Sequence, residues 1–339
     1  MSWQRSPLEA DVNRQSRGCY DRWVTQGEPR SLIRRVRWFI FGVIGIFILA
    51  DIALFFYPGL PILLLSVTAK TSPYCTVWRA VEDSKVKLHR DARRDALLAK
   101  SHVIRKDGEY KLWSTPEGEF WVPDTSDTIL AALLGQQQDK VYGDPQTGGV
   151  RRGDIVLDGG AHIGVYVKTA LEAGAEKIVA IEPSPDALEC LRRNFRKEIE
   201  AGKVVVYPKG IWDEEKRLVF YENGNGAAGD SFVEHAANAK VVADMPVTTI
   251  DKIVKELGLP RVDIIKADIK GAGTRMILGA EQTIRTFHPR MVISTEEEPE
   301  DPAAIRSAIM KIAPGYQFRA GPCFFGEGEI RNDALFFQY

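Results

Sequence analysis

The stretch of sequence from Asp154 to Pro183 reads DIVLDGGAHIGVYVKTALEAGAEKIVAIEP. Residues 155–157 and 177–181 are short apolar runs typical of buried parallel strands. Glycines directly follow the first run, and residues 161–173 have the composition of a helix. The pattern predicts a strand, a glycine turn, a helix and a second strand, which together form the βαβ unit of a nucleotide-binding sheet.

Two carboxylates in this stretch help to separate the ligands that such a unit binds. A dinucleotide places its pyrophosphate at the glycine turn, where the charge of Asp158 would repel it. The glycines also follow a GGxxxG spacing instead of GxGxxG, which disfavours a nicotinamide cofactor. S-adenosylmethionine instead offers an ammonium group to Asp158 and ribose hydroxyls to Glu182. We therefore favour this cofactor over NAD and over a βαβ crossover without a ligand.

The residues expected to bind S-adenosylmethionine come from the turn and from the end of the second strand. Backbone amides near the glycines are expected to donate to the carboxylate of the cofactor. The predicted cofactor-binding residues are Asp158, Gly159, Gly160, Ala161, Gly164, Glu182 and Pro183.

Composition excludes several classes of protein. The chain has 339 residues, a formal net charge of −1 and 45% hydrophobic residues, so it is neither disordered nor strongly basic. We therefore expect no nucleic-acid partner. The cysteines show no CxxC pair and no clustering with histidine, so no metal site is expected. Reduced thiols in a domain on the cytoplasmic side are the simplest interpretation of Cys19, Cys75, Cys190 and Cys323.

A long apolar stretch lies near the N-terminus. Residues 38–57 number about the twenty that a helix needs to cross a bilayer, and Trp38 and Tyr57 stand at its ends like interfacial aromatics. A buried core helix is the alternative, but such a helix is seldom apolar on every face. We expect a membrane anchor over residues 38–69, with the lipid bilayer as partner, formed by a transmembrane or re-entrant helical segment.

The topology of this anchor has two solutions. Arginines before the apolar stretch favour a cytoplasmic N-terminus, and a single crossing would then place the following domain on the opposite side. A hairpin turning at Pro58 and Pro61 would return the domain to the cytoplasm, which is the arrangement expected here. Asp51 would be costly in contact with lipid, so it is a candidate contact to a membrane protein partner.

The predicted organisation of the chain has four parts. A polar, arginine-rich segment over residues 1–37 precedes the anchor, and an amphipathic linker helix over 70–100 follows it. The domain itself covers residues 101–339, with its core at 150–339. A small antiparallel meander is expected near the start of this domain, and alternating strands and helices after Glu182 predict a doubly wound, mostly parallel α/β sheet with ligands at the carboxyl ends of its strands.

Three segments together resemble the FkbM-type S-adenosylmethionine-dependent methyltransferases. They are LDGGAHIG at 157–164, AIEPSPDALECLRRNF at 180–195 and VDIIKADIKGAGTRMILGAEQTI at 262–284. The resemblance extends over about residues 120–339. It implies a class I, Rossmann-like methyltransferase fold with a seven-stranded sheet and a terminal antiparallel strand, and methyl transfer to a hydroxyl oxygen.

The chain departs from the family pattern at three positions. His162 replaces the usual asparagine, and Lys270 and Gly273 replace two glutamates in the DIKGAG segment. A lysine there would repel the sulfonium of the cofactor if it faced the site. Asp268, at the end of a predicted strand, is the first candidate for the catalytic base, and His162 is the second. Glu296 and Glu297 are further candidates.

Two functions are consistent with these features. The first is a membrane-anchored O-methyltransferase acting on a hydroxyl of a lipid-linked, glycan or small hydrophobic acceptor. The second is a catalytically weak or inactive subunit that retains the fold for binding partners, an interpretation motivated by Lys270, Gly273 and Asp51.

Overall fold

A computed structural model describes most of the chain, in two units. The described residues are 30–56, 69–124, 129–222, 231–232, 240–295, 302–326 and 328–339. The units comprise Met1–Tyr57 and Pro58–Tyr339, and each is described by itself.

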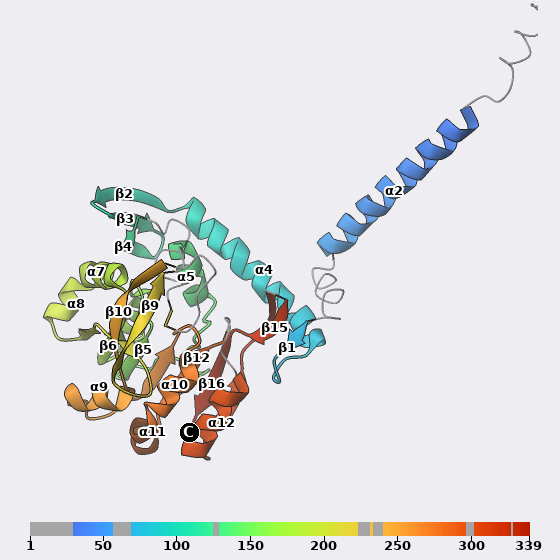
Figure 1. The fold of residues 1–339 in the computed structure, drawn as a ribbon. Coiled ribbons are helices and arrows are strands. Elements are labelled where there is room, and N and C mark those ends of the chain that lie inside the picture. Colours follow the sequence, from blue (N-terminus) through green and yellow to red (C-terminus); the bar gives the residue numbers. More distant parts are fainter. Residues whose placement is uncertain are drawn as a thin grey trace, which may run out of the picture. The chain divides into compact units, whose positions relative to one another are not determined.

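Helix α2, Arg30–Phe56, is the described part of the first unit (Figure 1). Its apolar side chains are largely exposed, with Trp38 at 68% and Phe39 at 74%. Among the residues that the structure describes, none of the helices is long and apolar enough to cross a membrane. The predicted membrane anchor over residues 38–69 is therefore not supported, and residues 57–68 of that prediction lie outside the described part.

A mixed seven-stranded sheet forms the centre of the second unit, in the order β13-β16-β12-β11-β5-β6-β7. Strands β12, β11, β5, β6 and β7 are parallel to one another, whereas β16 is antiparallel to both β12 and β13. This confirms the predicted α/β fold with a terminal antiparallel strand. The strands are β5 Ile155–Gly159, β6 Lys177–Ile181, β7 Val204–Tyr207, β11 Ile264–Ala267, β12 Arg290–Ser294, β13 Gln317–Ala320 and β16 Ala334–Gln338.

Alternating apolar side chains of these strands supply a core on each face of the sheet. In β5, Leu157 belongs to the core on one face of the sheet, whereas Val156 belongs to the core on the other face. Both side chains are fully buried. A strand covered on both faces has no polar positions to alternate with apolar ones, which explains the continuous apolar run in the sequence.

The helices differ from the sequence expectations mainly at their ends. The helix after β5 begins at Val165, four residues later than expected, because the turn continues through Gly164. Residues 273–287 form two helices with a break at Gly279, whose added Cβ would lie 2.2 Å from the carbonyl oxygen of Trp212. The helices of this part are α5 Ile129–Gln138, α6 Val165–Glu172, α7 Pro185–Asn194, α8 Arg196–Glu200, α9 Ile250–Glu256, α10 Gly273–Leu278, α11 Glu281–Phe287 and α12 Pro302–Ile312.

Three small sheets surround the central one. The expected antiparallel meander is confirmed as β2-β3-β4, at His102–Asp107, Tyr110–Thr115 and Gly118–Pro123. Strands β8, β9 and β10, at Gly210–Ile211, Lys216–Glu222 and Lys240–Thr248, form the second sheet. The third sheet joins distant parts of the sequence, with the order β1-β15-β14 and bounds Lys70–Thr71, Glu329–Asn332 and Cys323–Gly326.

Helix α4, Val77–Ala99, packs on α5 and β14, and Thr76 caps its N-terminus by accepting a hydrogen bond from the Arg79 amide. Several of its cations pair within the domain. Arg90 lies 3.2 Å from Asp333, and Arg93 lies 3.1 Å from Asp139. These two arginines of the amphipathic helix therefore bind the domain itself.

Cys75 and Cys323 form a disulfide. The expectation that the cysteines are reduced is therefore wrong for this pair, whose members lie 248 positions apart in the sequence. Cys190, also within the described residues, is a free and buried thiol.

Candidate functional site

The glycine turn after β5 is closely packed. Gly160 and Gly164 have φ values of +72° and +91°, and His162 between them also has a positive φ of +50°. The amides of Gly160 and Ala161 both donate to the carbonyl oxygen of Ile181, at 3.0 and 3.1 Å. These two N–H groups therefore hold the turn against β6 and, contrary to expectation, are not directed to a ligand carboxylate.

Glu182 follows β6 and is held in place by the backbone around it. One carboxylate oxygen accepts a hydrogen bond from the His162 amide at 2.8 Å, and the other accepts one from the Ser184 amide at 2.8 Å. The residue is only 6% exposed, yet it lines a cavity at this end of the sheet. A carboxylate has further lone pairs, so Glu182 can still accept hydrogen bonds from a ligand.

Asp158 lies in β5 and does not line this cavity. It is fully buried, and its carboxylate lies 2.9 Å from Nζ of Lys266, its partner in the register of β5 with β11. Burial raises the pKa of Asp158, and the neighbouring positive charge of Lys266 opposes that rise. Lys266 also donates a hydrogen bond of 3.0 Å to the carbonyl oxygen of Gly160. The Asp158–Lys266 pair therefore holds the glycine turn in place through the Gly160 carbonyl oxygen. Asp158 does not line the cavity, so in this arrangement it does not reach a cofactor ammonium there.

Asp268 follows β11 and faces the cavity. Its amide donates to the carbonyl oxygen of Gly159 at 2.9 Å, and its carboxylate accepts a 2.9 Å hydrogen bond from the hydroxyl of Tyr142. Burial pushes the pKa of Asp268 upward, but the charges of Lys270 and Lys266 and the Tyr142 hydrogen bond outweigh it, so the pKa lies below its usual value. Asp268 is therefore ionised at neutral pH.

A Tyr142→Phe substitution is expected to raise the pKa of Asp268, because it removes a hydrogen bond that stabilises the charged carboxylate. Carbon-13 NMR of the aspartate carboxyls over a pH titration measures this pKa, with Asp268→Asn identifying the signal. An unchanged pKa in the Tyr142→Phe protein would show that the hydroxyl does not act on Asp268.

The cavity brings together most of the predicted site residues. Those that line it are Gly160, Ala161, His162, Glu182, Pro183 and Asp268. Gly159 and Gly164 lie outside the lining and are close-packed instead. An added Cβ at Gly159 would lie 2.7 Å from Ile211, and one at Gly164 would lie 2.1 Å from the ring of Phe195. Glu296 and Glu297 are outside the described residues.

Other lining residues come from elements that sequence patterns did not connect to the site. Tyr142 follows α5, Lys209 precedes β8, and Phe220 lies in β9. These positions have no shared motif, so no local signal could have identified them. Lys270 also lines the cavity. In the DIKGAG segment this lysine replaces an acidic residue of the family pattern, and its charge would repel the sulfonium of the cofactor.

One comparison with known proteins covers part of the chain that lines this cavity. Residues 158–319 match the family model of the methyltransferase FkbM domain. No curated protein sequence matches the chain.

Two solved structures found in the comparison are methyltransferases. Methyltransferase FkbM from Methylobacillus flagellatus KT is 16% identical, with 77% of this chain and 60% of that chain covered and a TM-score of 0.40. A SAM-dependent methyltransferase from Agrobacterium tumefaciens is 13% identical, with 70% and 71% covered and a TM-score of 0.37. The chain spans only 60% of the length of the first protein.

Proposed function

We propose that this chain, in which residues 158–319 match the methyltransferase FkbM domain, binds S-adenosylmethionine in the cavity and methylates a hydroxyl group. The observation that supports this best is that three parts of the chain line one cavity at the same end of the sheet. The glycine turn, the Glu182 carboxylate and the Asp268 carboxylate all line the same cavity. They are brought there by β5, β6 and β11, which are adjacent and parallel.

The residues of the cavity fit this cofactor. Glu182 is positioned to accept hydrogen bonds from the ribose hydroxyls, while Ile211 and Phe220 offer apolar surface to a purine ring. Gly160 lets the turn pack directly against the segment at Asp268, because an added Cβ would lie 2.0 Å from the carbonyl oxygen of Asp268. Asp268 and Glu182 also supply negative charge for a ligand that bears an ammonium and a sulfonium.

In this proposal the cofactor supplies a methyl group on a positively charged sulfur. Transfer is an in-line displacement, so the rate depends on how the acceptor oxygen is oriented. Asp268 is ionised and can take the proton of the acceptor hydroxyl, and the Tyr142 hydroxyl holds the carboxylate in one orientation. His162, with a half-buried side chain at the same cavity, is the second candidate for this role.

A Glu182→Gln substitution is expected to weaken S-adenosylmethionine binding about 10- to 100-fold, the equivalent of losing charge-assisted hydrogen bonds of about 1.5–3 kcal/mol. Isothermal titration calorimetry on the purified full-length chain measures the change. Glu200→Gln, at an exposed carboxylate of α8 outside the cavity, is the matched control and should leave the affinity unchanged. No binding of S-adenosylmethionine to the wild-type protein at millimolar concentration would refute the proposal.

The second candidate function is a binding subunit with weak or no catalysis. Lys270 supports it, because this lysine lines the cavity and its charge acts on Asp268, the proposed base. A Lys270→Glu/Gly273→Glu double variant restores the acids of the family pattern. Methyl transfer to extracted membrane lipids and glycans that appears only in this variant would favour the binding subunit, whereas transfer by the wild-type chain would favour the enzyme.

Membrane attachment is a separate part of the proposal. It is motivated by the apolar sequence of residues 38–57 alone, and it would direct the enzyme to an acceptor that is lipid-linked, glycan or hydrophobic. Fractionation of cells that make the full chain tests it. Recovery in the membrane pellet after carbonate washing would support the anchor, and recovery in the supernatant would exclude it.

A further inference from the structure

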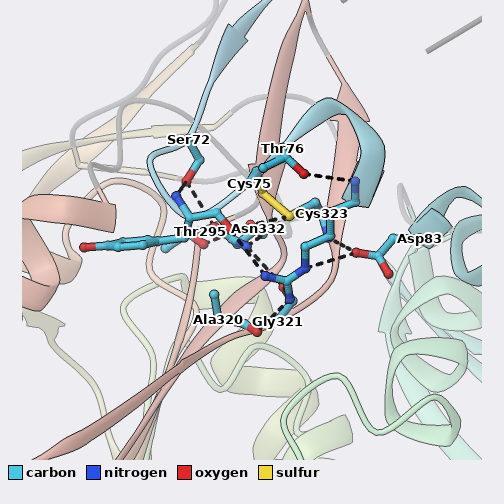
Figure 2. Close-up of a disulfide and its surroundings, with 11 residues drawn as sticks. Ser72, Cys75, Thr76, Asp83, Thr295, Ala320, Gly321, Cys323 and Asn332 are labelled. Atoms are coloured by element: carbon cyan, nitrogen blue, oxygen red, sulfur yellow. Dashed lines mark hydrogen bonds and ion pairs between the residues drawn. A yellow bond between two sulfur atoms is a disulfide. The ribbon is translucent and has the colours of Figure 1, made fainter. Parts of the chain in front are cut away.

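The Cys75–Cys323 disulfide joins two segments that lie near the beginning and near the end of the sequence of the second unit (Figure 2). Cys75 lies just before α4, and Cys323 begins β14. Their Cα atoms are 5.8 Å apart, within the range of ordinary disulfides. Cys323 is fully buried and Cys75 is 7% exposed, so the bond is shielded from solvent.

Hydrogen bonds independent of the sulfurs hold the first segment against the second. Strand β1 pairs in parallel with β15, and this pairing continues as the Ser72 amide donates to the carbonyl oxygen of Ile330 at 2.8 Å. The Ser72 hydroxyl donates to the side-chain oxygen of Asn332 at 3.0 Å. The backbone on the Cys75 side is therefore fixed relative to the C-terminal strands.

The start of α4 is fixed to the same place. Arg79 donates to the carbonyl oxygens of Ala320 and Gly321, at 3.0 and 2.8 Å. Asp83 accepts a 2.7 Å hydrogen bond from the amide of Cys323 itself. Both cysteines are thus held in position by their neighbours, so the two sulfurs meet without any rearrangement of the chain.

We infer that residues 69–339 acquire this disulfide in an oxidising compartment and function there with Cys75 and Cys323 joined. Buried, well-oriented cysteine pairs form stable disulfides in oxidising compartments, whereas cytosolic reductants keep thiols reduced. In the bond-forming step, one cysteine thiolate attacks a protein or glutathione disulfide and releases one donor thiol, and the other cysteine then attacks the resulting mixed disulfide and releases the second donor thiol. Two protons leave the cysteines, and two electrons reduce the donor disulfide to two thiols.

The charge pattern at the N-terminus agrees with this location. Four arginines directly precede the apolar residues 38–57 and favour a cytoplasmic N-terminus: Arg30, Arg34, Arg35 and Arg37. If that stretch crosses a membrane once, the domain lies on the opposite side, whereas a hairpin would return it to the reducing cytoplasm. The inferred oxidising compartment therefore differs from the cytoplasmic location expected from the sequence.

The redox state in cells tests the inference directly. Cells that make the full chain are quenched in acid, and free thiols are blocked with N-ethylmaleimide before unreduced digestion and mass spectrometry. We expect one cross-linked peptide containing Cys75 and Cys323, and a blocked thiol at Cys190, which serves as the internal control. Recovery of Cys75 and Cys323 as blocked thiols would overturn the inference.

Thermal unfolding separates the covalent bond from the packing around it. Dithiothreitol is expected to lower the Tm of the purified wild-type chain by about 5–10 °C, because the unfolded chain regains the freedom that the bond removes. The Cys75→Ser/Cys323→Ser variant should have this lower Tm with or without reductant. A Cys75→Ser/Cys323→Ser variant with the same Tm as the unreduced wild-type chain would contradict the inference.

This inference does not depend on the proposed methyltransferase activity. The disulfide and its surrounding residues do not line the cavity. The Cys75→Ser/Cys323→Ser variant should therefore bind S-adenosylmethionine as the wild-type chain does. Loss of the disulfide signal and loss of cofactor binding are separate results, so failure of one proposal is distinguishable from failure of the other.

Discussion

A Gly160→Ala variant is expected to lose binding at the cavity and to be less stable than the wild-type chain. The new Cβ would lie 2.0 Å from the carbonyl oxygen of Asp268 and 3.0 Å from its carbonyl carbon, and neither backbone atom can move alone. The positive φ of +72° adds strain of about 1–3 kcal/mol for a non-glycine residue. The turn and the segment at Asp268 must therefore separate, and both line the cavity.

Calorimetry with S-adenosylmethionine and thermal unfolding measure the two effects. Gly202→Ala is the matched control, because Gly202 has nearly the same φ of +69° but no atom within 4 Å of an added Cβ. The control isolates the cost of the backbone conformation from the cost of the steric clash. Equal losses in the two variants would show that close packing at Gly160 is not what the site requires.

Replacing Lys266 with methionine is expected to lower the free energy of unfolding by about 3–5 kcal/mol, because it leaves the buried carboxylate of Asp158 without its partner. The pair is 2.9 Å apart, and the two side chains are 4% and 0% exposed. Chemical denaturation at pH 7 measures the loss. Arg196→Met, which breaks an exposed pair with Glu200, is the control and should cost less than about 1 kcal/mol.

The pH dependence of this loss identifies its cause. Burial already raises the pKa of Asp158, and removing the lysine would raise it further. A carboxyl whose folded-state pKa is raised favours the folded state as pH falls, because the folded protein then binds the proton more tightly. The difference between wild type and Lys266→Met should therefore shrink between pH 7 and pH 5. A loss independent of pH would indicate a packing defect instead.

A Lys266→Met/Asp158→Asn double variant should recover part of the stability, because it contains no buried charge at this pair. Cofactor affinity in that protein is also informative. If Asp158 acts by supporting the turn and not by touching the ligand, recovery of stability should be accompanied by recovery of binding.

The central βαβ unit could be predicted because its signals are local. The apolar runs of β5 and β6, the glycines between them and the acid at Glu182 occur within 30 consecutive residues. Strand and helix periods there depend on near neighbours in the chain, so the fold class was predicted correctly. Gly160, Ala161 and Glu182, which were predicted to bind a cofactor, do line the cavity.

The role of Asp158 could not be predicted from the local sequence. Its position in the motif predicted contact with a cofactor, but the register of β5 with β11 places it directly opposite Lys266. That register joins residues 108 positions apart. A buried carboxylate is stable only with a partner, so the identity of the facing residue decides whether it remains available to a ligand.

The sequence by itself determined the α/β fold, the position of the glycine turn and the acids at the ends of β6 and β11, because hydrophobic period and turn composition act over short distances. Only the tertiary structure decided that Tyr142 holds Asp268, that Lys266 neutralises Asp158 and that Cys75 meets Cys323. Each of these contacts joins residues more than 100 positions apart. Such pairs form because the sheet packs its strands in a particular order, and no short-range pattern contains that information.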